Sequence, residues 1–118
     1  PWRYDYRQAG AVLAREAPPD APVLFFAYGQ FHTLEVNDVL DTARVTTVRA
    51  RGALIDALDQ QVDARGDAWL LAVIERAEQQ DLPGLVAAYR AAGLAVRTWH
   101  CYNIQPQLWV VHIAREGA

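Results

Sequence analysis

The sequence lacks several residue types that common active sites require. It contains no lysine, no serine and no methionine, and its only cysteine is Cys101. A phosphate-binding P-loop needs Gly-Lys followed by Ser or Thr, so the absence of lysine excludes this motif. Without serine, the chain has no serine nucleophile for acyl transfer. A lone cysteine forms no internal disulfide, so the redox compartment is not readable from the sequence.

Long hydrophobic runs are absent as well. No apolar stretch approaches the ~20 residues that a bilayer-spanning helix needs. The 118 residues are 53% hydrophobic and 21% charged, a globular composition. We therefore expect residues 1–118 to form a single soluble domain. The net charge is -3, and the basic residues, all arginine, are scattered from Arg3 to Arg115. Clustered positive charge, which a nucleic-acid partner would require, is therefore missing.

Hydrophobic periodicity predicts alternating helices and strands. Apolar residues at helical spacing predict helices over residues 5–16, 31–40, 53–62 and 80–92. Apolar or β-branched segments predict strands over residues 23–28, 44–48, 68–74, 94–102 and 108–113. Asp81 is the expected N-cap of the last helix, with Pro83 in its first turn and Gly93 just past its end.

This order predicts the α/β class. Strands that alternate with helices favour a small Rossmann-like domain of three layers, with a mostly parallel sheet of about five strands. Residues 103–107 between the last two strands are too few for a crossover, so these strands must form an antiparallel hairpin. We expect the strand order 2-1-3-4-5 or 2-1-3-5-4.

Candidate ligand-binding residues follow the first predicted strand. Ligands of such sheets bind beyond the carboxyl ends of the strands, where the strand order reverses. The pocket candidates at that edge are Tyr28, Gln30, His32 and Glu35. A Gly-x-Gly-x-x-Gly phosphate cradle is missing, because Gly29 is followed by the bulky Gln30 and Phe31. We therefore assign no cofactor and no catalytic residue.

The predicted hairpin carries His100, Cys101 and His112. The two histidines are candidate cross-strand neighbours, but zinc needs three or four ligands on one face. Cys101 points away from the His100 face if the strand is regular. We therefore interpret the histidines as ordinary sheet residues and assign no metal. The strand tryptophans and tyrosine are interpreted as core and hairpin-face residues in preference to a sugar-stacking surface: Trp69, Trp99, Tyr102 and Trp109.

Several segments resemble a known family. Residues 4–13 (YDYRQAGAVL) and 17–24 (APPDAPVL) resemble the start of the extracytoplasmic C-terminal domain of bacterial polytopic membrane glycosyltransferases, which are similar to dolichyl-phosphate-mannose protein mannosyltransferases. Residues 68–71 (AWLL) resemble a strand of that domain, and residues 94–102 with 108–112 resemble its closing hairpin.

The resemblance implies a non-catalytic domain that supports or orients the acceptor. The parent protein would be a glycosyltransferase using a polyprenyl-phosphate sugar donor, and its catalytic residue would lie in the membrane-embedded part. That part of the same polypeptide is the implied partner, together with a lipid-linked sugar or an acceptor glycan. The implied location is the periplasmic face of the inner membrane. The resemblance also implies that the chain continues from residues upstream of Pro1.

Two alternatives belong to other classes. The segment FAYG at residues 26–29 is faintly similar to the loop of γ-glutamylcyclotransferase-like enzymes, whose fold is a β-barrel. The other alternative is a self-standing α/β binding module of the cytosol.

Overall fold

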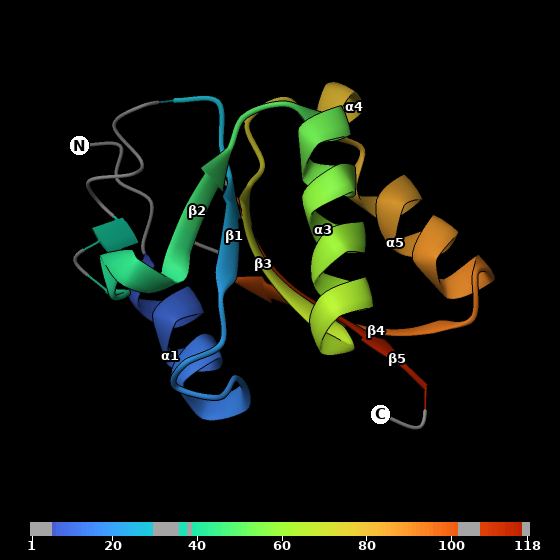
Figure 1. Cartoon of the computed structure of the whole chain (residues 1–118). Helices are drawn as coiled ribbons and strands as arrows, with labels where there is room; N and C mark the ends of the chain where they lie inside the picture. The colour runs from blue at the N-terminus through green and yellow to red at the C-terminus, as the bar shows by residue number, and fades with distance from the viewer. Residues whose placement is uncertain (1–5, 30–35, 38, 102–106, 117–118) are drawn as a thin grey trace.

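The computed structural model describes residues 6–29, 36–37, 39–101 and 107–116. Within these ranges, helices and strands alternate until the chain closes in a hairpin (Figure 1). The elements are α1 (Tyr6–Glu16), β1 (Val23–Phe26), the 3-10 turn η1 (Thr42–Arg44), β2 (Val45–Val48), α3 (Arg51–Arg65), β3 (Asp67–Val73), α4 (Ala77–Gln80), α5 (Leu82–Ala91), β4 (Leu94–Cys101) and β5 (Leu108–Arg115).

The five strands form one sheet in the order β2-β1-β3-β5-β4. β1 pairs in parallel with both β2 and β3, and β5 pairs antiparallel with both β3 and β4. The fold class predicted from the sequence is therefore confirmed, as is the second of the two strand orders. The returning arm of the hairpin, β5, lies inside the sheet, and β4 lies at its edge.

Helices cover both faces of the sheet. α1 lies on one face, while α3 and α5 lie on the other (Figure 1). Because side chains alternate along a strand, Phe25 of β1 and Leu71 of β3 pack on the α1 side, whereas Phe26 and Leu70 pack on the α3 side. Every residue of β1 is buried, as a strand covered on both faces requires.

The caps predicted for the last helix, Asp81 and Gly93, are confirmed, and Gly66 provides a further cap at the end of α3. The Asp81 side chain accepts a hydrogen bond from the Gly84 N–H, so Asp81 is the N-cap of α5. Gly66 closes α3 with a φ of 86°, and Gly93 follows α5 with a φ of 88°. Both glycines thus take the left-handed conformation that has no steric cost without a Cβ.

The predicted boundaries differ most around Asp81. The prediction of one helix over residues 80–92 is wrong at its start, because Gln80 ends the separate helix α4 and α5 begins at Leu82. Asp81 itself has a φ of 43°, which breaks the helical path between them. Most of the helix predicted over residues 31–40 lies outside the described residues. None of the described helices has the length and apolar character needed to cross a membrane.

Candidate functional site

The carboxyl ends of the three parallel strands meet around Tyr28, which follows β1. The Tyr28 N–H donates to Oε1 of Glu75, 2.9 Å away, and its carbonyl accepts from an Arg49 guanidinium nitrogen at 3.2 Å. The Arg76 guanidinium carbon lies 5.3 Å from the centre of the Tyr28 ring. Arg49 follows β2, while Glu75 and Arg76 follow β3, so residues from all three strand ends contact one another here. We call these four residues the Tyr28 cluster.

A buried glutamine holds the β3 side of the Tyr28 cluster in place. Gln80 has no exposed surface. Its side-chain oxygen accepts hydrogen bonds from the N–H groups of Glu75 and Arg76, both at 2.9 Å, and its Nε2 donates to the Val73 carbonyl at 2.7 Å. The amide thus satisfies the backbone where β3 ends and turns toward α4. Gln80 is a positioning residue for Glu75 and Arg76.

Positive charge predominates at this edge. Arg51 begins α3, and its Nε donates to the Gln80 carbonyl at 3.0 Å. Arg51 also lies 4.0 Å from the Asp81 carboxylate. The residue before it, Ala50, is the N-cap of α3 and provides no side-chain acceptor for the first turn. The N-terminus of a 15-residue helix, which carries partial positive charge, therefore lies next to the arginines.

Sequence reasoning located this edge but named a different set of residues. Of the predicted pocket residues, the structure places Tyr28 in the cluster; Gln30, His32 and Glu35 lie outside the described residues. Arg49, Glu75 and Arg76 were missed. They follow β2 and β3, whereas the search considered only the residues that follow the first strand. A search of the residues after all three parallel strands would have found them. No local pattern marks Gln80, because its role depends on contacts with a strand end.

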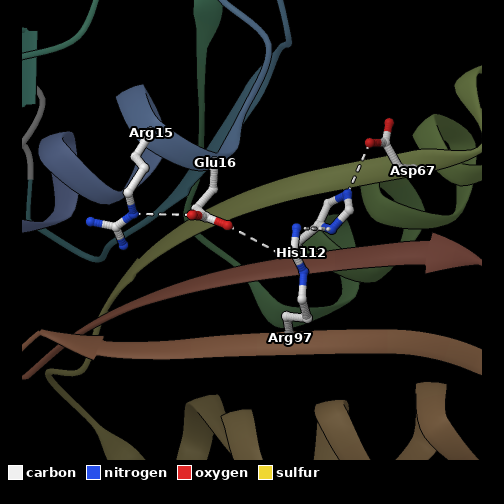
Figure 2. Close-up of polar contacts among 5 residues, drawn as sticks. All are labelled: Arg15, Glu16, Asp67, Arg97 and His112. Carbon is white, nitrogen blue, oxygen red and sulfur yellow. Dashed lines mark hydrogen bonds and ion pairs between the residues drawn. The ribbon is translucent and has the colours of Figure 1, made fainter.

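A second polar cluster connects the end of α1 with the start of β3 and with β4 and β5 (Figure 2). His112 on β5 has its Nε2 2.9 Å from an Asp67 carboxylate oxygen and its Nδ1 3.2 Å from an Arg97 nitrogen. Because a guanidinium only donates hydrogen bonds, Nδ1 must be the acceptor, so the proton of the neutral ring lies on Nε2. Both ring nitrogens are thus engaged, and the imidazole connects two side chains.

The cluster continues from Arg97 to helix α1. Arg97 donates to one Glu16 oxygen at 3.1 Å, and Arg15 donates to the other at 3.0 Å (Figure 2). The adjacent Arg15 and Arg97 hold the pKa of the Glu16 carboxyl below its ordinary value. This row of side chains connects the end of α1 with β4, β5 and the start of β3. Its geometry is that of a structural link.

The histidines of the hairpin are not cross-strand neighbours, so that part of the prediction is wrong. The register pairs His100 with Trp109 and Arg97 with His112. His100 stacks on Trp109 at 4.0 Å between ring centres, and His112 stacks on Trp69 at 4.1 Å. Because side chains alternate, the two imidazoles lie on opposite faces. The described residues contain no group of three or more potential metal ligands.

The remaining hairpin residues are packed in the core or stacked against other rings. Cys101 is buried, and burial raises the pKa of its thiol. Trp69 is buried and stacks on Trp99 with 6.0 Å between ring centres. Trp109 belongs to the opposite face, where it is partly buried against the core. Tyr102 lies outside the described residues. The described tryptophans therefore act as core and hairpin-face residues.

Comparison with known proteins shows no family for this chain. No protein-family model matches the chain, and no curated protein matches it. Among solved structures, the chain is similar to a release-factor-specific protein-(glutamine-N5) methyltransferase from Alicyclobacillus acidocaldarius, with 12% identity and a TM-score of 0.46 over 92% of this chain and 88% of that one. It is also similar to a chain of the E. cuniculi Mtq2–Trm112 complex, which methylates the termination factor eRF1, with 12% identity and a TM-score of 0.46 over 98% of both chains. At this identity and TM-score the similarity assigns no function to this chain.

These findings contradict the predicted relationship to membrane glycosyltransferases. The similar structures are methyltransferases, and no glycosyltransferase family model matches. The segments that carried the resemblance form α1, β1, β3 and the hairpin. Such elements describe a scaffold that many unrelated functions share. The acceptor-orienting role, the glycosyltransferase parent and the membrane-embedded partner are therefore corrected. In one of the similar structures, Mtq2 forms a complex with a separate protein, Trm112.

The γ-glutamylcyclotransferase alternative is wrong as well. That fold is a β-barrel, whereas this chain has an open sheet with helices on both faces. The FAYG segment at residues 26–29 ends a central parallel strand here.

Proposed function

We propose that this protein is an α/β binding module that holds a small organic anion at the carboxyl edge of its parallel strands, beside Tyr28. The observation that carries the proposal is the convergence on Tyr28 of Arg49 from the end of β2 and Arg76 from the end of β3. Open α/β sheets bind ligands at such an edge, where the chain passes from one side of the first strand to the other. Here β1 lies between β2 and β3, so Tyr28 stands at this position.

The charges at the edge favour an anion. Arg49, Arg51 and Arg76 lie near the N-terminus of α3, where the helix dipole adds to their field. The nearby carboxylates already have partners, since Glu75 accepts from the Tyr28 N–H and Asp81 caps α5. Gly29 is the only glycine between β1 and β2. A dinucleotide pyrophosphate needs several glycines there, because they let the backbone approach it closely. A compact carboxylate or monophosphate suits the edge better.

Binding without catalysis agrees with the side chains present. Among the described residues, Cys101 is buried with a raised pKa, so its thiol is a poor nucleophile. His112 uses both ring nitrogens within its own cluster. The arrangement therefore supports holding a ligand and provides no nucleophile next to a general base in the described part of the chain.

Thermal unfolding tests the proposal. The midpoint is measured with inorganic phosphate, citrate, glutamate and a nucleoside monophosphate, because a ligand that binds only the folded state raises the midpoint by mass action. We expect at least one anion to raise it, and we expect Arg49→Ala and Arg76→Ala to reduce that response. Arg65→Ala is the matched control, since it removes an exposed arginine at the far end of α3.

Two results would overturn the proposal. One is that none of the anions changes the midpoint of the unmodified protein. The other is that Arg65→Ala reduces the response as much as Arg49→Ala and Arg76→Ala do, which would mean that the anions act through overall charge.

A further inference from the structure

An open groove lies between α5 and the β4–β5 hairpin, on the face of the sheet opposite α1. Its volume is about 450 Å³. Val86, Ala87 and Arg90 of α5 form one wall, and Thr98 of β4 and Trp109 of β5 contribute to the other. The groove is on different elements from the Tyr28 cluster, which is built from the ends of β1, β2 and β3.

The groove runs beside an edge strand. β4 lies at one end of the sheet, and β5 is its only strand partner in the described ranges. β4 has eight residues, whereas β2 at the other end of the sheet has four. An edge strand of this length presents a row of backbone donors and acceptors that another chain can pair with.

The hydrogen-bond pattern shows which backbone groups of β4 point outward. The Gln107 carbonyl and the Arg115 N–H bond toward β3, at the two ends of β5. By alternation, Val110 and His112 point their backbone groups toward β4, where they pair with Trp99 and Arg97.

Val96 and Thr98, the two residues that flank Arg97 on β4, therefore direct their N–H and C=O groups away from β5. An Arg90 nitrogen donates to the Val96 carbonyl at 2.9 Å, which agrees with this direction. Thr98 has its outward groups at the mouth of the groove.

The outer surface of α5 is unusually apolar. Its exposed positions include Pro83, Ala87, Ala88 and Ala91, and Arg90 is its only charged residue. A helix on the surface of a globular protein normally carries polar residues on its solvent side. This composition agrees with a helix that another chain covers.

We propose that β4 accepts an extended, acidic peptide segment of a partner protein as an additional strand. The peptide backbone pairs with the outward groups of Thr98, one peptide side chain enters the groove beside Trp109 and Ala87, and a peptide carboxylate binds Arg90. Among the described residues that line the groove, Arg90 is the only arginine and none is a carboxylate, although the whole chain has a net charge of -3. The groove is therefore complementary to an acidic partner.

Selection of peptides tests this inference. A phage-displayed library of random decapeptides is selected on the intact chain, and the enriched peptides are synthesised and measured by fluorescence polarisation. We expect them to combine an apolar residue with an acidic residue in an extended sequence. We expect Arg90→Ala to weaken binding about tenfold, the effect of losing one charge-assisted contact.

Two exposed alanines of α5 provide a matched pair. Ala87 lines the groove and Ala88 does not. Ala87→Glu places a carboxylate where the peptide side chain would lie, so it should abolish binding, whereas Ala88→Glu should leave binding unchanged. Equal loss in both variants would overturn the site, and so would the absence of any enriched peptide.

Amide hydrogen exchange separates strand addition from other modes of binding. We expect exchange of the Thr98 N–H to slow when the enriched peptide is bound, because that N–H then donates to the peptide. Unchanged Thr98 exchange in a saturated complex would overturn strand addition. Sedimentation of the protein alone tests the alternative occupant: a dimer that Ala87→Glu dissociates would show that a second copy, and not a partner peptide, covers β4.

Discussion

Asp67 and His112 bond across β3 and β5 although the strand register does not place them opposite each other. Asp67 pairs with Ala114 and His112 pairs with Trp69, so the hydrogen bond of 2.9 Å runs diagonally. Diagonal neighbours on one face of a sheet are within reach of long side chains. The His112 ring is also held by stacking on Trp69.

Substitution of Asp67 should separate hydrogen bonding from charge at this pair. The His112 side chain is 14% exposed and the Asp67 side chain 33% exposed, so the bond is partly shielded from water. We expect Asp67→Ala to lower the free energy of unfolding by about 1 kcal/mol, since it removes the acceptor of the His112 Nε2–H. Asp67→Asn keeps an acceptor oxygen and should cost less. Urea denaturation at pH 7.5 measures both, and equal losses would contradict the tautomer assigned to His112.

Gln80 should be among the most sensitive polar residues of the fold. Gln80→Ala leaves the N–H groups of Glu75 and Arg76 and the Val73 carbonyl without their side-chain partner. We expect a loss of about 2–3 kcal/mol in the free energy of unfolding, as for other buried groups left unsatisfied. Its neighbour Gln79 is exposed, so Gln79→Ala is the control and should change stability little. A small effect at Gln80 would show that the end of β3 is held by other contacts.

Tyr89 predicts a stability change at high pH. Its hydroxyl donates to an Asp59 oxygen at 2.7 Å, and burial, followed by this bond, raises the pKa of Tyr89 well above its ordinary value. The unfolded chain loses this proton at a pH of about 10, where the folded protein still holds it. The contribution of the group is therefore complete below pH 10 and decreases as the pH rises further toward the folded pKa.

Comparison with Tyr89→Phe measures this contribution. The variant should be less stable by about 1 kcal/mol at pH 8, because the hydrogen bond to Asp59 is lost. The gap between the two proteins should narrow between pH 10 and pH 11, as followed by urea denaturation at fixed ionic strength. A gap that stays constant or widens over this range would contradict the raised pKa.

Two helical glycines should respond oppositely to alanine. A Cβ on Gly84 would collide with the Asp81 carboxylate that caps α5, so Gly84→Ala should displace the cap and lower stability by about 1 kcal/mol. A Cβ on Gly52, in the first turn of α3, would meet nothing within 4 Å. Gly52→Ala should therefore raise stability by about 0.5 kcal/mol, because alanine loses less backbone freedom on folding. Thermal midpoints of the two variants report the signs directly, and the same sign in both would contradict this account.

Local signals predicted most of the fold. The apolar run from Val23 to Tyr28 is flanked by Pro22 and Gly29, and its first four residues form the fully buried strand β1. The short connection at residues 103–107 required an antiparallel hairpin, because no crossover is possible over so few residues. The sequence did not choose between the two strand orders. That choice depends on which arm of the hairpin packs against β3. Residues 108–113 (LWVVHI) are more continuously apolar than residues 94–101 (LAVRTWHC), which agrees with the place of β5 inside the sheet.

The site was only partly predictable, for a related reason. Tyr28 was found because it follows a recognisable strand. The Gln80 carbonyl accepts from Arg51, which lies 29 residues earlier in the chain at the start of α3, so no local pattern relates these two residues. The pairing of His100 with His112 failed because the hairpin register depends on the connection between the strands. A shift of three positions placed Trp109 opposite His100 and moved His112 to the other face.

The sequence by itself determined the α/β class and the hairpin, because periodicity, capping residues and connection lengths are local properties. It also indicated the edge of the sheet for which we propose a ligand. The tertiary structure alone decided which side chains meet. It brought Arg49 and Arg76 to Tyr28, buried Gln80 beneath them, and left β4 as an open edge beside α5. Contacts between residues distant in the chain depend on strand order and register, and those are settled only when the two faces of the sheet are packed at once.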